Sequence, residues 1–405
     1  MPIASTAEIR AQFPALARRH QGYPVAYFDG PGGTQVPQAV AEAVSDYLLH
    51  HNANTHWEYP TSIETDAALA AAHAALADFV GGAPEEIVFG ANMTTLTFHL
   101  GRALGHGWRR GDAVVVTELD HHANSDPWRV LGRELGLEVR AIRFRPEDGR
   151  LDLEDAARKL TPGVKLLALG AASNALGTVN EVEHLTALAH AAGAQVFIDG
   201  VHYAAHLLPD VRAWGCDYFV CSAYKFYGPH VGVLWGRRAL LEGLDAPKLE
   251  PAARAAPECL ETGTLNHEGI VGAGAAVDFI AGLCPEPLAR RERLARVCAA
   301  LHERGAGLLG QLWQGLAALP DVRLYGPPPG TPRTATVCFT HARHDTGAVA
   351  RALAGHGVFV SNGDFYATTV ARRYGLEAHG FVRAGCAAYT SAEEVRRLLD
   401  AVRAL

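Results

Sequence analysis

Short apolar runs alternate with amphipathic stretches between about residues 86 and 220, and this alternation is the main structural signal in the chain. Runs of three to six apolar residues bounded by polar ones are typical of buried strands, and apolar residues at helical spacing separate them. Continuously apolar strands alternating with helices predict a mostly parallel sheet covered by helices on both faces. The expected strands are 87–89, 113–117, 139–144, 165–169, 195–198 and 218–220, and the expected helices between them are 94–104, 127–134, 153–160 and 182–192.

The segments on either side of this alternating region show different patterns. Before it we expect a helix over 6–17, a strand over 25–29, a helix from Pro37 to residue 50, a loop over 51–60 and a helix over 62–80 capped by Ser62. After it come a long charged helix over 286–319 and shorter strands and helices, with a proline-rich surface loop at 326–332. We therefore predict three parts: an N-terminal segment (1–20) packing on the small domain, a large domain (21–270) and a small C-terminal α+β domain (271–405).

Composition narrows the class of protein. The chain has 405 residues, of which 49% are hydrophobic and 20% charged, with a net charge of −7, so nucleic acid is not an expected partner. No apolar run approaches the roughly 18 residues that span a bilayer, and residues 1–19 do not form a signal peptide, so no membrane association is expected. The seven cysteines are scattered without a C-x-x-C pair, which predicts reduced thiols, a cytoplasmic location and no metal site.

Lys225 is the most informative single residue. The chain has four lysines against thirty-two arginines, so a lysine retained at the end of an apolar strand calls for a chemical reason. An amine can form a Schiff base, which a guanidinium does not do in practice. The alternative is a lysine whose amine extends from a loop into solvent.

Polar residues follow each expected strand, where the ligand of a parallel sheet binds. Met93 and Thr94 open a helix, which could hold a phosphate or be an ordinary helix start. His121 and His122 could bind a metal, stack on a ring or have no role. The remaining strand ends carry Asn174, Asp199 and Ser222.

Pyridoxal phosphate explains this set as a whole. It needs a lysine for the Schiff base, an acid to keep its pyridine nitrogen protonated, a phosphate site and a flat partner for its ring. The lysine would be Lys225 and the acid Asp199. The phosphate site would be formed by Thr94 and Ser222, and the flat partner would be His121.

Several motifs resemble the class V aminotransferase family of pyridoxal phosphate enzymes, in its cysteine desulfurase and selenocysteine lyase-like branch. The resemblance runs from about residue 8 to 403 and implies the fold type I of pyridoxal phosphate-dependent transferases: an α/β fold with a mostly parallel seven-stranded sheet flanked by helices, plus a smaller α+β domain. It also implies a homodimer with the active site at the subunit interface. The motifs are Asp199-Gly200-Val201-His202, residues 222–229, 118–128, 173–177, 261–266 and 28–37, and Val382-Arg383-Ala384.

The resemblance also implies a role for each matching residue. Lys225 would form the Schiff base and carry protons, Asp199 would pair with the pyridine nitrogen, and His121 would stack on the ring as a third catalytic residue. Arg383 would clamp the carboxylate of a small amino-acid substrate, its alternative being a surface salt bridge. The remaining cofactor-binding residues would be Met93, Thr94, Ser222 and Tyr224 near the phosphate, Thr264 from the second subunit, His202 near the ring oxygen, and Asn174 beside the ring and substrate.

Three departures from the family pattern bear on the reaction. Tyr224 stands where the family commonly has a histidine, although a phenol can donate the same hydrogen bond. The region in which the desulfurases carry their persulfide-forming cysteine, 358–367 here, contains no cysteine, and Ser361 stands where an arginine is expected. Cys259 is the one cysteine that could substitute.

We therefore predict a pyridoxal phosphate enzyme that is cysteine desulfurase-like but acts as a C–S or other β-lyase without a persulfide cysteine. An aminotransferase or an amino-acid racemase or epimerase is the alternative from the same family. An inactive scaffold is a remote alternative. A metal-dependent phosphoesterase built on Asp120-His121-His122 is disfavoured, because the further aspartate clusters of that class are missing.

Overall fold

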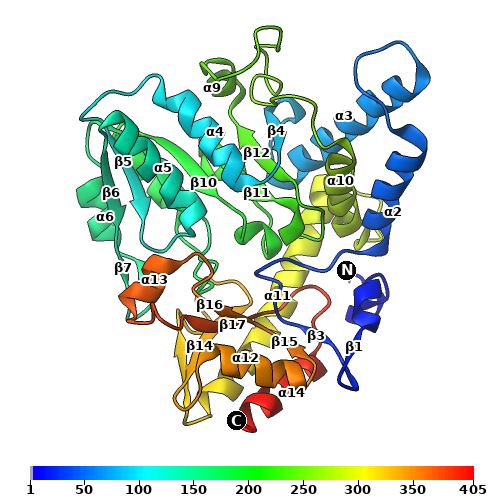
Figure 1. Ribbon diagram of the computed structural model, residues 1–405, viewed down its shortest axis with the longest axis vertical. Coiled ribbons are helices and arrows are strands. Elements are labelled where there is room, and N and C mark those ends of the chain that lie inside the picture. Colours follow the sequence, from blue (N-terminus) through cyan, green and yellow to red (C-terminus); the bar gives the residue numbers. More distant parts are fainter. Residues whose placement is uncertain (1–2) are drawn as a thin grey trace.

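The central element of the protein is a seven-stranded sheet, shown by a computed structural model that describes residues 3–405 (Figure 1). Six strands are parallel, and only β12 runs antiparallel to its neighbours, β4 and β11. The predicted α/β fold with a mostly parallel sheet is confirmed. The strand order is β4 (Ile87–Gly90), β12 (Gly232–Gly236), β11 (Tyr218–Ser222), β10 (Gln195–Asp199), β9 (Val164–Gly170), β5 (Ala113–Thr117) and β6 (Glu138–Ile142).

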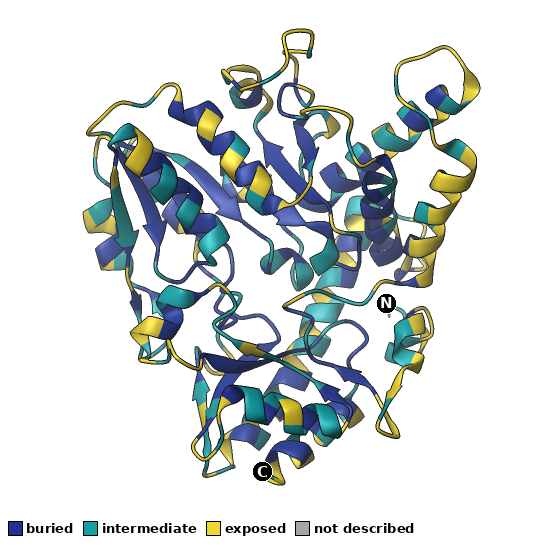
Figure 2. Cartoon of the chain, viewed as in Figure 1, coloured by how far each residue is buried: buried dark blue, intermediate teal, exposed yellow. Residues whose placement is uncertain are grey.

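The inner strands of this sheet are mostly apolar because both faces are covered, whereas the edge strand β6 also carries Glu138 and Arg140 (Figure 2). Alternate residues of β5 show this directly: Val115 packs into one core cluster, while Val114 and Val116 pack into another. The second cluster contains side chains of α4 (Met93–Gly105) and α5 (His122–Leu135). The first contains side chains of α3 (Pro60–Val80), α6 (Leu153–Lys159), α7 (Val182–Ala191) and α10 (His267–Gly282).

A second, antiparallel sheet lies below the first in Figure 1 and consists of β13 (Val322–Tyr325), β14 (Thr336–His341), β17 (Phe381–Gly385) and β16 (Ser361–Gly363). This sheet packs in a third core cluster, which includes side chains of α11 (Arg290–Ala317), α12 (Thr346–Gly355) and α14 (Ala392–Arg403). Strand β3 (Ala26–Tyr27) pairs with β15 (Val358–Phe359), so an early segment of the chain joins this part of the molecule. The domain boundaries at 20/21 and 270/271 stay a prediction.

Several element boundaries differ from the predictions. The first predicted helix is only α1 (Thr6–Arg10), and a separate 3₁₀ turn starts at Pro14, whose ring cannot continue a helix. Ser62 is not a cap: α3 begins at Pro60, and the buried Ser62 hydroxyl accepts a hydrogen bond from Trp57 N. The other elements are α2 (Gln38–Asp46), a π-helical turn (Tyr47–His51), α8 (Val211–Trp214), α9 (Arg238–Glu242), α13 (Thr368–Arg373), β1 (Arg19–His20), β2 (Tyr23–Pro24), β7 (Phe144–Arg145) and β8 (Arg150–Leu151).

Strand β12 was missed because its first residue belongs to a glycine-rich stretch. A Cβ at Gly232 would lie 2.4 Å from the carbonyl carbon of Asn92, so only glycine lets β12 pass the loop that leads into α4. Across residues 3–405, none of the helices combines the length and apolar character needed to cross a membrane.

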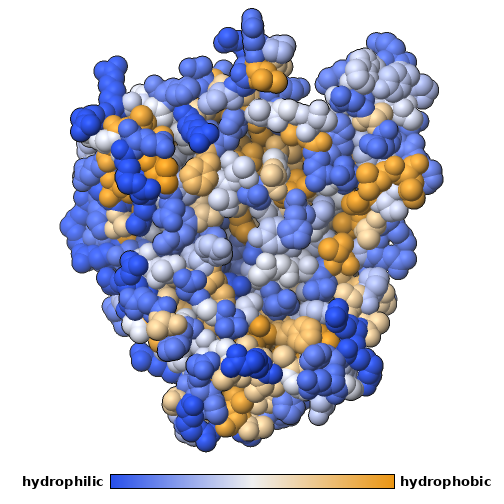
Figure 3. Space-filling view, viewed as in Figure 1, coloured by the Kyte–Doolittle hydropathy of each residue, from blue (hydrophilic) through white to orange (hydrophobic). Residues whose placement is uncertain are grey.

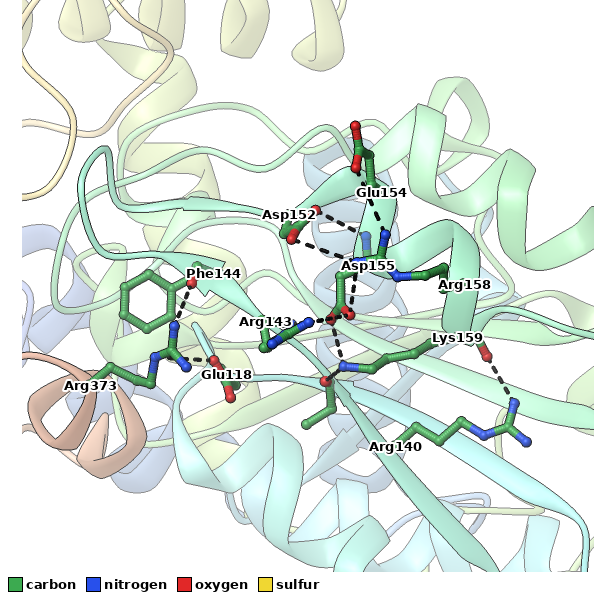
Figure 4. A network of polar contacts seen from close by, with 11 residues as sticks. Glu118, Arg140, Arg143, Phe144, Asp152, Glu154, Asp155, Arg158, Lys159 and Arg373 are labelled. Atoms are coloured by element: carbon green, nitrogen blue, oxygen red, sulfur yellow. Dashed lines mark hydrogen bonds and ion pairs between the residues drawn. The ribbon is translucent and has the colours of Figure 1, made fainter.

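A network of charged groups fastens α6 to the edge strand β6 (Figure 4). The buried Asp155 carboxylate accepts hydrogen bonds from Arg143 N at 2.8 Å and from Lys159 Nζ at 2.5 Å. Burial alone would raise the pKa of Asp155, but these hydrogen bonds outweigh it and lower the pKa to about 2. Close to these contacts, Arg373 of α13 lies 3.6 Å from Glu118, the residue that follows β5 (Figure 4).

Replacing Asp155 with Asn should lower the free energy of unfolding by about 1–3 kcal/mol at pH 7, because it leaves Arg143 and Lys159 without their anionic partner. The folded-state pKa lies below the ordinary value, so the stabilisation is present above pH 4 and is lost as the pH falls toward 2. Chemical denaturation at pH 7 and pH 3 measures the effect. Glu154→Gln is the control, since that side chain on the same helix is 91% exposed; equal losses in the two variants would contradict the prediction.

Candidate active site

The carboxyl ends of the parallel strands open into a cavity of about 320 Å³ that is also lined by residues of the second sheet. Strand β17 contributes Arg383 to its wall, and the segment after β16 contributes Phe365 and Tyr366. The structure thus brings together all the predicted site residues except Ser222 and Thr264. Those lining the cavity are Met93, Thr94, His121, Asn174, Asp199, His202, Tyr224, Lys225 and Arg383.

Lys225 lies in a short 3₁₀ turn directly after β11, and its amine points into the cavity. Lys225 Nζ donates a hydrogen bond to Pro31 O and has no anionic group within 4 Å among residues 3–405. Burial and the charge of Arg383 lower the pKa of Lys225 to about 7, although Asp199 opposes this effect. A large fraction of the amine is therefore neutral, and nucleophilic, near pH 7.

Asp199 ends β10, next to β11 in the sheet. Its Oδ1 accepts a hydrogen bond from Val201 N at 2.9 Å, whereas Oδ2 has no hydrogen-bond partner within the described part of the chain. Burial raises the pKa of Asp199 to about 6. A buried carboxylate with a free oxygen facing a cavity fits a cationic group bound there.

Asp120 is a second buried carboxyl in the cavity wall, to which the sequence analysis assigned no role. It accepts hydrogen bonds from Gly170 N and from Asn124 Nδ2, both at 2.9 Å. A Cβ on residue 170 would lie 2.5 Å from Asp120 Oδ1, so a glycine is required for this contact. Burial and the neighbouring Asp199 raise the pKa of Asp120 to about 7. Its position at the end of a strand could have identified Asp120 from the sequence. The sequence analysis instead chose the histidines that follow it as the candidate site residues.

The start of α4 forms one end of the cavity. Asn92 caps the helix by accepting a hydrogen bond from Thr95 N at 2.9 Å, and Met93 N donates to Ser222 Oγ at 3.2 Å. Ser222 is buried and supports the first turn of α4 from behind instead of lining the cavity. Thr94 and Tyr224 line it directly, and the Tyr224 ring stacks on His230 with their centroids 4.8 Å apart.

The two neighbouring histidines after β5 point in different directions. His121 lines the cavity, and burial together with the charge of Lys225 lowers its pKa to about 4, so its ring is neutral. His122 is held by Asp126 at 3.0 Å and by Thr369 at 3.2 Å. No group of three or more potential ligands within residues 3–405 could hold a metal ion. His121 lines the cavity, where a ligand ring could lie against it, and stacking on that ring stays a prediction.

Arg383 is deeply buried, with 4% of its surface exposed, which contradicts the interpretation as a surface salt bridge. Its Nη1 donates to Asn174 O at 2.8 Å, and its guanidinium lies 4.0 Å from the centre of the Phe365 ring. Burial lowers the pKa of Arg383 to about 10, so the side chain keeps its charge at pH 7. A buried cation without a carboxylate within 4 Å in the described residues is suited to bind the carboxylate of a ligand.

Phe365 and Tyr366 close the cavity from the side of the second sheet, and the sequence analysis assigned them no role. Both adopt the left-handed backbone conformation, with φ of +57° each, which costs a residue with a side chain about 1–2 kcal/mol. Two hydrogen bonds hold them there: His122 N, at the start of α5, donates to Tyr366 O at 2.7 Å, and Asn174 Nδ2, in the loop after β9, donates to Phe365 O at 2.9 Å.

Thr264 does not line this cavity. It lies at two other depressions in the surface, of about 710 and 720 Å³, which share Leu265 as a lining residue. Its predicted contact with the cofactor requires a second subunit.

None of the seven cysteines lines the cavity. Cys259, the proposed substitute for the missing loop cysteine, is buried in the core cluster beneath α4 and α5, and its thiol donates to Leu241 O. Burial raises the pKa of the Cys259 thiol, which disfavours the reactive thiolate.

Three buried polar atoms in the cavity wall have no hydrogen-bond partner within residues 3–405: His202 Nδ1, Asn174 Oδ1 and Arg383 Nε. Such atoms are costly unless a ligand or water satisfies them. Together with the Lys225 amine, the free oxygen of Asp199 and the N-terminus of α4, they fit an aromatic ring with polar substituents and a phosphate. The residues present therefore fit pyridoxal phosphate.

Comparisons with known proteins agree with this arrangement. The family model for aminotransferase class-V matches residues 26–398. A cysteine desulfurase of Serratia proteamaculans is 33% identical over 412 residues, covering 96% of both proteins, and one of Klebsiella pneumoniae is 34% identical over 416 residues, covering 98% of this chain and 97% of that protein. The apo structure of a cysteine desulfurase from Thermococcus onnurineus NA1 has a TM-score of 0.88 at 29% identity, covering 100% of this chain and 98% of that one.

A crystal structure of an Escherichia coli cysteine desulfurase has a TM-score of 0.85 at 25% identity and covers 99% of this chain and 98% of that one. The match to the family model extends over most of the sequence, and the relatives share about a third of their residues with it along nearly their full length. The chain therefore belongs to the class-V aminotransferase family of pyridoxal phosphate-dependent enzymes.

Proposed function

We propose that this protein is a cysteine desulfurase-like enzyme that acts on a small α-amino acid as a C–S or other β-lyase, without a persulfide cysteine. The observation that carries the proposal is the Lys225 amine, with a pKa of about 7, in a cavity that also contains Asp199 and Arg383 but no thiol. A neutral amine, a buried acid and a buried guanidinium supply the groups that amino-acid chemistry at this cofactor needs.

We assign the cofactor-binding roles as follows. Lys225 is the covalent attachment point, Asp199 faces the ring nitrogen, and the neutral ring of His121 stacks on the cofactor. Met93, Thr94 and Tyr224 lie at the phosphate end, where the N-terminus of α4 favours an anion, with Ser222 supporting the turn and His202 and Asn174 beside the ring. When bound, pyridoxal phosphate supplies an electrophilic carbon for the substrate amine and a conjugated ring that delocalises negative charge from the substrate.

Two side chains act directly on the substrate in this proposal. The charged Arg383 guanidinium binds and orients the substrate carboxylate, while the neutral Lys225 amine removes the Cα proton. Both side chains line the same cavity, and the charge of Arg383 helps to lower the pKa of Lys225 and so favours its neutral form.

Elimination is supported by the distribution of thiols. Burial raises the pKa of six cysteines (Cys216, Cys221, Cys259, Cys298, Cys338 and Cys386), and none of the seven lines the cavity. A sulfur atom released from the substrate therefore meets no thiolate of the same subunit in the cavity, and we propose that it leaves as sulfide or, from an S-substituted substrate, as a free thiol. Aminotransferase and racemase reactions would use the same Lys225, and their products distinguish them from elimination. The free cysteines also support a reducing compartment, and we propose a cytoplasmic location.

We further propose a homodimer in which Thr264 contacts the cofactor of the partner subunit. Exposed apolar and aromatic side chains gather on one segment of the chain: Leu48, Leu49, Trp57, Tyr59 and Ile63. Figure 3 shows apolar surface over α2, the helix that leads into this segment, at the right of the view. An exposed apolar surface of this kind is typical of a subunit interface.

The protein supplied with pyridoxal phosphate should be yellow, and borohydride should fix the cofactor to Lys225, as peptide mass analysis would show. Incubation with cysteine should then release pyruvate, ammonia and sulfide in equal amounts, because elimination breaks the Cβ–S bond without oxidation or reduction. Alanine with protein-bound persulfide would show a desulfurase instead, and a keto acid with aminated cofactor would show an aminotransferase. A Cys259→Ser variant should release pyruvate at the rate of the unmodified protein.

A further inference from the structure

We infer that Phe365 and Tyr366 form an aromatic wall that selects cysteine derivatives carrying a flat apolar group on sulfur, in preference to cysteine itself. This inference rests on the proposed β-lyase function and names its substrate class. It derives from the segment between β16 and α13, which the proposed chemistry does not use.

The aromatic wall is held rigidly. Two consecutive bulky residues in the left-handed conformation persist only where the surroundings enforce it. Here the backbone oxygens of Phe365 and Tyr366 accept hydrogen bonds from Asn174 Nδ2 and His122 N, at 2.9 and 2.7 Å. The Asp364 carboxylate fixes the turn from the other side, accepting from Tyr366 N at 3.1 Å and from Thr368 Oγ1 at 2.6 Å.

Each ring of the wall lies against a residue with a proposed role in binding. The Phe365 ring faces the guanidinium of Arg383, 4.0 Å from its centre, and the Tyr366 ring stacks on His121 at 5.3 Å with 30° between the planes. Tyr366 is 71% exposed, which places it at the mouth of the cavity. A substrate whose carboxylate reaches Arg383 would therefore have its side chain near these two rings.

The rest of the cavity offers no partner for a charged side chain. Its carboxyl groups, Asp120 and Asp199, are both buried, and the first is already hydrogen-bonded to Gly170 and Asn124. Its two cationic side chains already have proposed partners: Lys225 is assigned to the cofactor and Arg383 to the substrate carboxylate. The other lining residues carry no charge: they include the small or apolar Ala123, Ala172 and Val201, and one hydroxyl, that of Ser361. Flat apolar groups gain most from such a wall, through offset or edge-to-face contact with its rings.

The reaction stays balanced with such a substrate. Lys225 takes the Cα proton, the Cβ–S bond breaks, and the arenethiolate leaves with the electron pair and takes up a proton. Water then completes the release of pyruvate and ammonia. An arenethiolate is a better leaving group than sulfide because its conjugate acid is stronger.

The test uses two unreactive amino acids whose side chains match S-phenylcysteine and S-methylcysteine, with sulfur replaced by methylene: L-homophenylalanine and L-norvaline. Their dissociation constants for the cofactor-loaded protein are measured from the change in visible absorption. Homophenylalanine should bind about 10-fold more tightly than norvaline. Tyr366→Ala should weaken the binding of homophenylalanine by about 3–10-fold, the loss expected from one aromatic contact, and the binding of norvaline by less than 2-fold. Tyr366→Phe should keep the preference, and Phe365→Leu should reduce it.

Tyr23→Ala is the control, because Tyr23 is also an exposed tyrosine, at 42%, and does not line this cavity. Equal affinity for the two amino acids, with normal loading of cofactor, would overturn the inference and leave the proposed function intact. The inference would also be overturned if the variants at 365 and 366 weakened the binding of both amino acids equally. If neither amino acid changes the absorption of the loaded protein, the proposed function fails and the inference fails with it.

Discussion

Replacing Lys225 with Met should reduce turnover by about 10²–10⁴-fold and, in the protein without cofactor, raise stability. The loss of turnover follows from removing the group that is proposed to take the Cα proton. The gain in stability follows from burial: the folded protein holds this amine at a pKa of about 7, well below its ordinary value of 10.5. Burying the charged form is costly, and methionine has no such cost.

The gain should depend on pH in a defined direction. Between about pH 7 and 10.5, the unfolded chain keeps a proton on Lys225 that the folded protein has released, so the stability of the unmodified protein rises with pH. The advantage of Lys225→Met should therefore be on the order of 4 kcal/mol at pH 7 and shrink as the pH approaches 10. Denaturant unfolding of the cofactor-free proteins at several pH values measures it.

Lys165→Met is the matched control, because Lys165 is 41% exposed and pairs with Asp112 at 3.6 Å. It should neither gain stability nor lose turnover. If the Lys225→Met protein were less stable than the original at pH 7, burying the Lys225 amine would not destabilise the folded protein, and the prediction would be wrong.

Replacing Arg383 with Lys should weaken the binding of amino acids by about 10–100-fold, because a lysine cannot make the paired hydrogen bonds of a guanidinium to a carboxylate. The corresponding amines, which lack the carboxylate, should bind both proteins alike. Comparing L-norvaline with n-butylamine by visible absorption of the cofactor-loaded protein gives this contrast directly.

Arg333 provides the matched control for this prediction. It is also buried, but it lies over the ring of Trp313 at 4.7 Å and does not line the cavity. Arg333→Lys should leave the ratio of the two dissociation constants unchanged. If Arg383→Lys weakened the binding of the amine as much as the binding of the amino acid, Arg383 would be maintaining the shape of the cavity and would not be binding the carboxylate.

The predicted strands agreed with the structure because burial on both faces forces a strand to be apolar throughout. Segment 113–117 matches β5, and 195–198 falls within β10. Helix starts were less predictable. Helix α5 begins at His122, several residues before the prediction, because the His121 ring accepts a hydrogen bond from Ala123 N and so caps the helix. Residue type does not normally identify histidine as a cap.

The set of candidate residues was predictable for a related reason. Parallel strands end at the same edge of a sheet, so polar residues that follow them along the chain converge in space. This rule brought Lys225, Asp199 and His121 to one cavity. It could not distinguish His121 from His122, whose side chain is held by Thr369 of α13, because that choice depends on the packing of another element.

By itself, the sequence determined the α/β fold, the family and the residues at the strand ends, since burial patterns and strand-end chemistry are local properties. Only the tertiary structure decided which groups face the cavity and in what state of charge. Asp120 and the aromatic pair at 365–366 line it through contacts between distant segments, and no thiol does. The pKa of Lys225 likewise depends on burial and on Arg383, some 160 residues away along the chain, because desolvation and charge act through space and not along the sequence.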